Sequence, residues 1–173
     1  GQVSDFTLTN QNGQAVSLAD LRGKVWVADI IFTRCAGPCP QMTRQMAELQ
    51  AALPADSPVQ LVTLTTDPGF DTPPVLNQYA RQFGANLDRW TFLTGTKREI
   101  ANLAAGGLKL SAAEVKPEER AAPEDLFIHS TIFVVVDKQA RLRGVYETTG
   151  PDVNPQAAKE DILAAVETLT REH

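Results

Sequence analysis

The sequence has only two cysteines, Cys35 and Cys39, among its 173 residues. Two cysteines cannot build the multi-bridge disulfide framework on which small secreted domains rely. A bridge between these two would close a very short loop, so it would add little stability through chain entropy. A structural staple is therefore the weakest interpretation of the pair, and electron transfer and metal binding are the two stronger ones.

Long apolar runs and an excess of positive charge are also absent. No stretch approaches the roughly 20 apolar residues that cross a bilayer, and 16 Lys and Arg against 21 Asp and Glu give a net charge of −5. A chain with this negative net charge lacks the excess of positive charge that is typical of proteins that bind nucleic acid or an anionic membrane surface. Because the sequence begins at Gly1 rather than Met, we expect a signal or membrane anchor upstream of it.

What remains is a sequence that alternates strand-like and helix-like patterns. The Asn12-Gly13 pair between two short strand-like runs predicts an N-terminal β-hairpin, because both residues tolerate positive φ. The nearly continuous apolar run Lys24–Phe32 predicts a strand covered on both faces. Further strands are predicted at 59–66, 89–95 and, as a strand–turn–strand unit, 130–147; helices are predicted at 41–53, 72–84, 97–105 and 154–172.

This order of elements predicts an α/β fold with a mixed central sheet and helices on both faces. The polar segment 106–125, which includes the charged stretch KPEER, is expected to be a solvated surface loop. We find no internal repeat and no linker that would divide the chain. The expectation is one domain over residues 1–173, acting as a monomer.

The cysteine pair lies where the buried strand gives way to a helix. The positive end of a helix dipole stabilises thiolates and lowers the thiol pKa. Four residues of helical rise span about 6 Å, which a disulfide can bridge. A C-x-x-x-C pair at this place can therefore form a disulfide when oxidised and chelate a metal when reduced, and thiolates favour Cu(I) or Zn(II) over hard cations.

Histidine is equally scarce, and its position restricts the choice of metal. His173 is the last residue, whereas His129 stands directly before the apolar strand Thr131–Val136. If that strand is a sheet neighbour of Lys24–Phe32, the two strand ends bring His129 to the thiols. A structural zinc ion normally takes four protein ligands, for which the chain has too few candidates. Two sulfurs and one imidazole nitrogen instead suit trigonal Cu(I), or Cu(II) with an added ligand.

Three blocks of the sequence together resemble the Sco/SenC family. They are the N-terminal block that ends in RCAGPCPQM, the block TTDPGFDTPPVLNQYARQFG, and the block HSTIFVVVDKQARLRGVYE. The resemblance covers nearly the whole chain and implies a membrane-anchored, thioredoxin-like copper protein that assists assembly of the binuclear copper centre of cytochrome c oxidase. By this resemblance, Cys35 and Cys39 match the family's thiolate ligands and His129 its imidazole ligand.

The chain departs from the family pattern between the cysteines. Family members often carry an acidic residue there, whereas this chain has Ala36-Gly37-Pro38, whose Gly-Pro-Cys ending resembles the active-site turn of thioredoxin. The departure raises the possibility of a redox task beside copper handling. It removes none of the proposed ligands.

Four further residues lie near the expected site. Asp67 and Asp71, in TTDPGFDTP, are candidates to orient His129 or the cysteine loop, although Pro68 and Pro73 also fit a plain turn and helix start. Met42 and Met46 continue the helical series that Cys39 begins. We expect both to pack in the core rather than to bind copper through their thioethers.

The sequence therefore predicts a metallochaperone rather than an enzyme. It would hold one copper ion per chain through Cys35, Cys39 and His129 and serve cytochrome c oxidase subunit II, or another copper or thiol protein, in the periplasm or on the outer face of an energy-transducing membrane. The alternative is a thiol–disulfide reductase or peroxidase that uses the same cysteines without metal. Thioredoxin-type oxidoreductases place a cis-proline before the strand that faces their cysteines, and IHSTIF has no proline there, which favours metal binding.

Overall fold

The structure, a computed structural model, describes residues 1–108, 110 and 131–173. Seven strands form one sheet: β1 (Thr7–Asn10), β2 (Ala15–Ser17), β3 (Trp26–Ile31), β4 (Gln60–Thr65), β5 (Trp90–Thr94), β6 (Ile132–Val136) and β7 (Leu142–Glu147). The helices are α1 (Leu18–Leu21), α2 (Cys39–Ala52), α3 (Pro73–Gln82), α4 (Lys97–Ala101) with the π-helix η1 (Asn102–Gly107), and α5 (Pro155–Arg171).

The sheet is mixed, with strand order β2-β1-β5-β4-β3-β6-β7. β3 lies near its centre, parallel to β4 and antiparallel to β6. Every residue of β3 is buried, as its nearly continuous apolar sequence predicts. The pairing of β3 with β6 confirms that the strand following His129 is a sheet neighbour of the strand preceding the cysteines.

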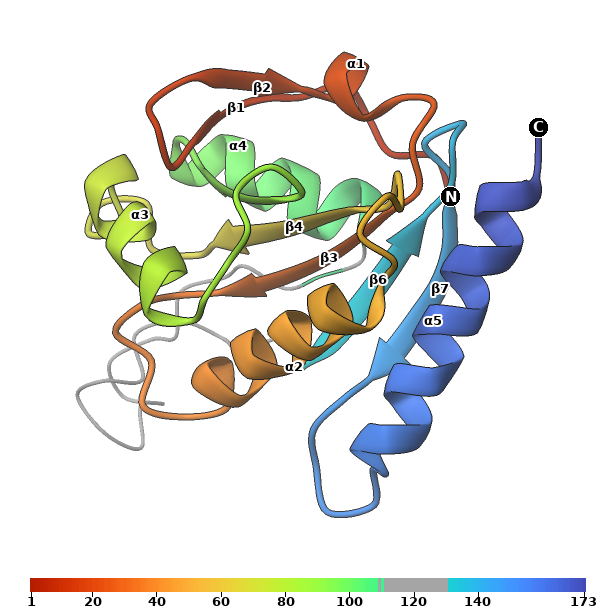
Figure 1. The fold of residues 1–173 in the computed structure, drawn as a ribbon. Coiled ribbons are helices and arrows are strands. Elements are labelled where there is room, and N and C mark those ends of the chain that lie inside the picture. The colour runs from red at the N-terminus through yellow and green to blue at the C-terminus, as the bar shows by residue number, and fades with distance from the viewer. Residues whose placement is uncertain (109, 111–130) are drawn as a thin grey trace.

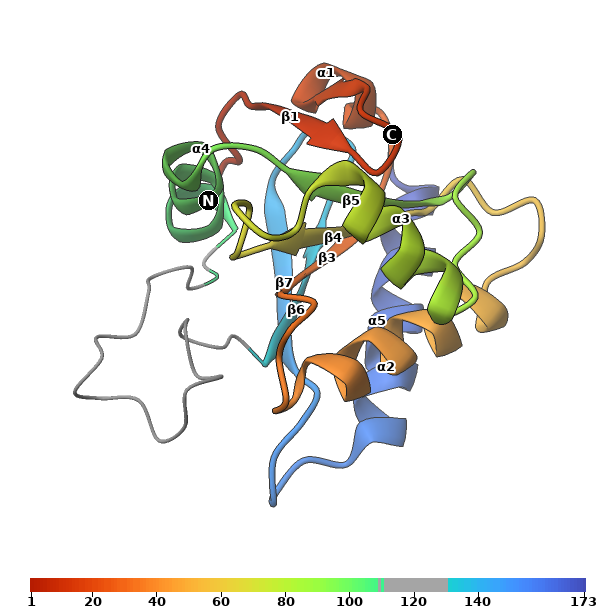
Figure 2. The same cartoon turned by 90° about the vertical axis from the view of Figure 1, so that its left-hand side faces the viewer.

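Helices cover both faces of this sheet, which confirms the predicted architecture. In Figures 1 and 2, α2, α3 and α5 lie on one side of the sheet, and α4 with η1 lies on the other. Side chains of α2, α3 and α5 pack on alternate residues of the strands to form one core cluster, which includes both cysteines. The intervening strand residues form a second cluster with α1, α4 and η1.

Most predicted elements are present, with shifted ends. The hairpin around Asn12-Gly13 forms, with Gly13 at φ +77°, and α3 ends before Gly84 at φ +72°. The helix predicted at 97–105 begins with a capping box at Thr96 but changes to the π-helix at Asn102. Helix α1 escaped prediction because one turn is too short to show a period. Most of the predicted loop 106–125, including KPEER, lies outside the described residues.

Candidate metal and thiol site

The end of β3 and the start of α2 place the two cysteines. After β3 the chain turns, and the Cys35 N–H donates to the Phe32 carbonyl at 3.1 Å. Helix α2 then begins at Cys39, and its first turn contains Pro40. Proline is favoured at this position, because the N–H that it lacks would have no hydrogen-bond partner within the first helical turn. The two thiols therefore lie at the junction of strand and helix, as predicted.

Both cysteines are reduced and buried, with Cys35 6% and Cys39 2% exposed. The Gly37 N–H donates to the Cys35 Sγ at 3.3 Å. A hydrogen bond with Cys35, burial and the nearby Cys35 charge together raise the pKa of the Cys39 thiol. The prediction of a lowered thiol pKa is thus wrong for Cys39, because its hydrogen bond with Cys35 and its burial raise that pKa.

The turn before Cys35 is held by a buried carboxylate. Asp71 Oδ2 accepts hydrogen bonds from the Thr33 N–H at 3.0 Å and from the Thr65 hydroxyl at 2.6 Å, and Oδ1 accepts from the Thr33 hydroxyl. Burial raises the pKa of Asp71, against the opposing effect of these hydrogen bonds. Asp71 thereby fastens the start of α3 to the cysteine turn.

A second contact joins the same two segments at the surface. Arg34 donates to Asp67 Oδ2 through Nη2 at 2.6 Å and through Nε at 3.1 Å. The Arg34 side chain is 42% exposed and that of Asp67 is 7% exposed. The Arg34 guanidinium also lies 4.2 Å from the centroid of the Phe70 ring. Phe70 is 44% exposed, so an apolar and a cationic group stand together beside the thiols.

Polar groups also lie beneath the pair, inside the core. The Thr43 hydroxyl donates to the Cys39 carbonyl at 3.0 Å and lies 2.7 Å from the Tyr79 hydroxyl. Burial raises the pKa of Tyr79, the hydrogen bond with Thr43 opposes this effect, and the charges of Cys39, Asp29 and Cys35 raise the pKa further. Asp29, fully buried in β3, has its pKa raised to about 7 by burial.

The predicted site residues are thus only partly brought together. Cys35 and Cys39 are adjacent, and Asp67 and Asp71 hold the two residues that precede Cys35 in sequence. His129 lies outside the described residues, and within residues 1–108, 110 and 131–173 no three His, Cys, Asp or Glu side chains form a metal-binding group. Met42 and Met46 are fully buried in the core, as predicted.

Sequence reasoning missed Thr33, Thr65, Tyr79 and Asp29. Only Asp29 left a signal, as the single charge within an otherwise apolar strand. The others depend on contacts between distant parts of the chain. Thr33, for example, is 38 residues from Asp71.

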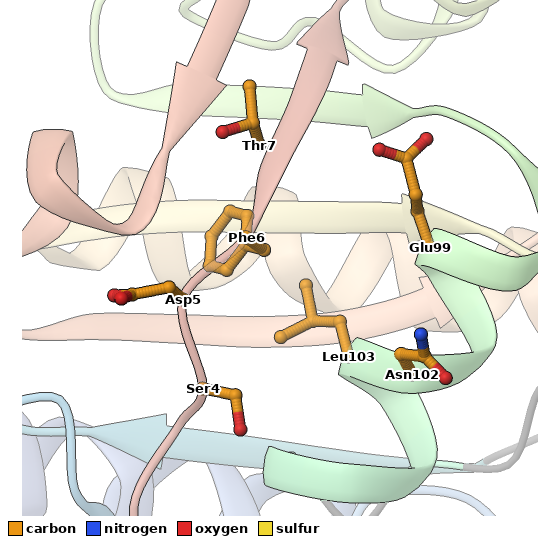
Figure 3. Close-up of a pocket in the computed structure, with 7 residues that line it drawn as sticks. All are labelled: Ser4, Asp5, Phe6, Thr7, Glu99, Asn102 and Leu103. Atoms are coloured by element: carbon orange, nitrogen blue, oxygen red, sulfur yellow. The ribbon is translucent and has the colours of Figure 1, made fainter.

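A cavity of about 650 Å³ lies apart from this site. Figure 3 shows that its lining comes from the segment before β1, the first residue of β1, α4 and η1. Phe6 and Leu103 belong to the core on the face of the sheet opposite the cysteines. The cavity is therefore not an entrance to the thiols. Its lining residues are Ser4, Asp5, Phe6, Thr7, Glu99, Asn102 and Leu103.

Comparison with known proteins gives consistent matches. The SCO1/SenC family model matches residues 2–167. The SCO1 protein homolog of Bacillus subtilis is 37% identical over 158 residues, which are 88% of this chain and 79% of that protein. A putative copper-binding protein of Stutzerimonas stutzeri is 28% identical over 144 residues, 82% of this chain and 67% of that protein.

Among solved structures, the fold is similar to that of BsSco, described as a member of the Sco family of cytochrome c oxidase assembly proteins with a disulfide switch. The TM-score is 0.81 at 32% identity, and the match covers 99% of this chain and 95% of that one. The similarity therefore extends over the elements that carry Cys35 and Cys39 as well as over the rest of the fold.

Proposed function

The chain belongs to the SCO1/SenC family, and on that premise we propose that it binds one copper ion through Cys35 and Cys39 and assists the assembly of cytochrome c oxidase. The observation that carries the proposal is the pair of reduced, adjacent thiols at the junction of β3 and α2. Two thiolates are soft donors and select Cu(I) over the hard cations that carboxylates hold.

His129 is the proposed third ligand. It precedes β6, and β6 pairs with β3, the strand that leads to Cys35. Two thiolates, Cu(I) and a neutral imidazole carry a total charge of −1, and with Cu(II) the total is zero. The start of α2 and the Arg34 guanidinium tolerate either charge. We take copper to be cargo that passes to a partner, for which cytochrome c oxidase subunit II is the candidate.

Asp71 and Asp67 have a supporting role in this proposal. Their hydrogen bonds to Thr33 and Arg34 fix the backbone directly before Cys35. A metal site gains affinity when its ligands are held in place before the ion arrives. Delivery would occur on the outer face of an energy-transducing membrane. Within the described residues, no helix has the length and apolar character to cross a bilayer.

A second candidate function is thiol–disulfide exchange by the same pair. The hydrogen bond between Cys35 and Cys39 favours it, because two thiols in contact are placed to form a bridge when a partner disulfide is reduced. Reduction of the cysteines of a copper-receiving partner would use this reaction without making the protein a general reductase. The two functions require opposite states of the pair, since a disulfide cannot supply thiolates to copper.

An anaerobic titration of the reduced protein with Cu(I), against a competing chelator, tests the proposal. We expect one copper ion per chain for the reduced protein, none for the disulfide form, and loss of tight binding in both Cys35→Ser and Cys39→Ser. Equal copper uptake by the reduced and disulfide forms would overturn the assignment. Fast, copper-independent turnover of a generic disulfide by wild type would favour the reductase function instead.

A further inference from the structure

A second cavity lies between the turn of the N-terminal hairpin and helix α3, and we name it the α3 groove. Its volume is about 670 Å³, within the range of pockets that hold small ligands. In Figure 1 the β1–β2 turn lies beside α3, and the Asn77 Nδ2 donates to the Asn12 Oδ1 at 3.1 Å between them. Neither cysteine is among the described residues that line the groove, so it is separate from the proposed copper site.

The hairpin turn forms a wall of the groove that its own hydrogen bonds hold in place. The Asn10 Oδ1 accepts from the Asn12 N–H and from the Gln14 N–H, each at 2.9 Å. The Asn10 N–H donates to the Gln14 carbonyl at 2.8 Å. Because this wall is ordered before a ligand arrives, binding costs little conformational entropy there.

Gln11 supplies the groove with a hydrogen-bond donor that is not yet used. The residue is only 4% exposed, and its Oε1 accepts from the Phe92 N–H at 3.1 Å. This bond fixes the orientation of the side-chain amide, because the reverse orientation would place an NH2 group against an N–H donor. The Nε2 group has no hydrogen-bond partner among the described residues, and Gln11 lines the groove. A buried amide in this state favours a ligand that brings an acceptor atom.

The groove also contains a cation that no described acid neutralises. Arg81 lies in the last turn of α3 and is exposed, and none of the ion pairs between described residues includes it. The described lining residues include no Asp or Glu, although the whole chain has a net charge of −5. The donors of Gln11 and Arg81 therefore favour a negatively charged ligand rich in acceptors. A guanidinium binds a carboxylate through two parallel hydrogen bonds.

The length of the groove and its other lining residues favour a peptide as this ligand. The groove follows α3 from Pro73 to Arg81, a helical rise of about 12 Å, and three extended residues span about 10 Å. A peptide presents a carbonyl acceptor at every residue to the side-chain amides of Gln11, Asn12 and Gln78. No aromatic ring is present among the described lining residues to stack on a nucleic acid base.

We propose that the α3 groove binds the last three residues of a peptide. Its C-terminal carboxylate pairs with the Arg81 guanidinium, and one of its backbone carbonyls accepts from the Gln11 Nε2. The ligand is then the C-terminal tail of a partner protein, which the groove holds without covering Cys35 or Cys39. This inference goes beyond the proposed function and does not depend on copper binding.

An NMR titration of the ¹⁵N-labelled protein tests the proposal, with the tripeptide acetyl-Ala-Leu-Ala as the probe. We expect the free-acid peptide to shift the side-chain amide resonances of Gln11. The same peptide with a C-terminal amide should bind about 10-fold more weakly or less, the factor that corresponds to one lost hydrogen bond with a charged group. Added salt should weaken the free-acid peptide as well, because the Arg81 guanidinium is exposed.

Two variants remove the two donors separately. Arg81→Gln removes the cation at an exposed position, so the variant should fold. Gln11→Glu keeps an acceptor for the Phe92 N–H but replaces the free donor with negative charge. Each should weaken binding of the free-acid peptide by about 10-fold or more. The matched control is Arg98→Gln, which removes an exposed arginine of α4 on the other side of the sheet and should bind the peptide as wild type does.

Three results would overturn the inference: no binding of the free-acid peptide, equal affinity for the acid and the amide, or wild-type affinity in Arg81→Gln. Acetate or inorganic phosphate that binds as tightly as the tripeptide would show a site for small anions, and the peptide assignment would be wrong. The copper titration is a separate measurement. A failure of the peptide assignment therefore leaves the proposed function unchanged.

Discussion

The carboxylate of Asp71 holds the backbone of Thr33, two residues before Cys35. Its Oδ2 accepts the Thr33 N–H at 3.0 Å, although 38 residues separate the two in sequence. The same carboxylate accepts the hydroxyls of Thr33 and Thr65. The approach to the thiols is thus fixed from the start of α3. This contact and the ion pair between Arg34 and Asp67 join the cysteine block to the TTDPGFDTP block.

Replacing Asp71 should loosen the cysteine turn. In Asp71→Asn one acceptor oxygen becomes an NH2 group, which faces donors that it cannot satisfy. We expect the free energy of unfolding to fall by about 2 kcal/mol, the order of a lost buried hydrogen bond to a charged group. Urea denaturation measures it, with the exposed Asp56→Asn as the control. Copper affinity should fall too, and unaltered affinity would show that Asp71 serves the fold alone.

The thioether of Met46 should contribute packing and not copper ligation. Met46 is fully buried in the same core cluster as Cys39. Met46→Ala should lower the free energy of unfolding by about 2–5 kcal/mol through the cavity it leaves. Met46→Leu, which removes sulfur but keeps volume, should cost less than about 1.5 kcal/mol and still bind one copper ion. Loss of copper by the leucine variant would instead make Met46 a ligand.

His129 should matter more for Cu(II) than for Cu(I). Two thiolates alone can hold Cu(I) in linear geometry, whereas Cu(II) needs further donors. His129→Ala should therefore change the thiolate-to-Cu(II) charge-transfer spectrum and weaken Cu(II) binding much more than Cu(I) binding. His173→Ala is the matched control, since it removes the other histidine. Copper spectra identical to those of wild type would remove His129 from the ligand set.

Asp29 should make stability fall as pH rises from about 4 to about 7. The usual pKa of its carboxyl is 3.8 and burial raises it to about 7, so the unfolded chain releases the proton first and the folded chain holds it longer. Above pH 7 the folded state carries the full cost of the buried charge. Asp29→Asn should thus stabilise the protein by up to about 4 kcal/mol at pH 8 and by much less at pH 4.

Urea denaturation of wild type and Asp29→Asn at both pH values measures this difference. Asp137→Asn is the control. Burial would raise the pKa of Asp137, but hydrogen bonds with Arg141, Arg143 and Gln139 hold it below its usual value. The contribution of the Asp137 carboxylate to the free energy of unfolding is therefore present above about pH 4 and is lost only in stronger acid. Equal stability differences for Asp29→Asn at pH 4 and pH 8 would contradict a raised pKa.

The sequence by itself determined the order of elements and the place of the thiols. Local patterns suffice for this, because each signal sets the backbone conformation of residues close to it in sequence. These signals are the apolar run of β-branched residues, the Asn12-Gly13 pair, and the prolines in the first turns of α2 and α3. The same local reasoning placed Cys35 and Cys39 at the strand–helix junction. It also assigned Met42 and Met46 to the core, since both fall on the buried side of the helical repeat.

Only the tertiary structure decided the chemical environment of the thiols. Local reasoning assigned Cys39 the effect of a helix dipole, but its burial and its contact with Cys35 raise the pKa instead. Three further features depend on which segments become neighbours in space. They are the side of the sheet that Asp29 shares with Cys39, the hydrogen bond of Asp71 with Thr33, and that of Thr43 with Tyr79. Packing over the whole chain decides which segments become neighbours. Contacts between distant segments produce no periodic pattern in the sequence of either segment, so local reasoning does not find them.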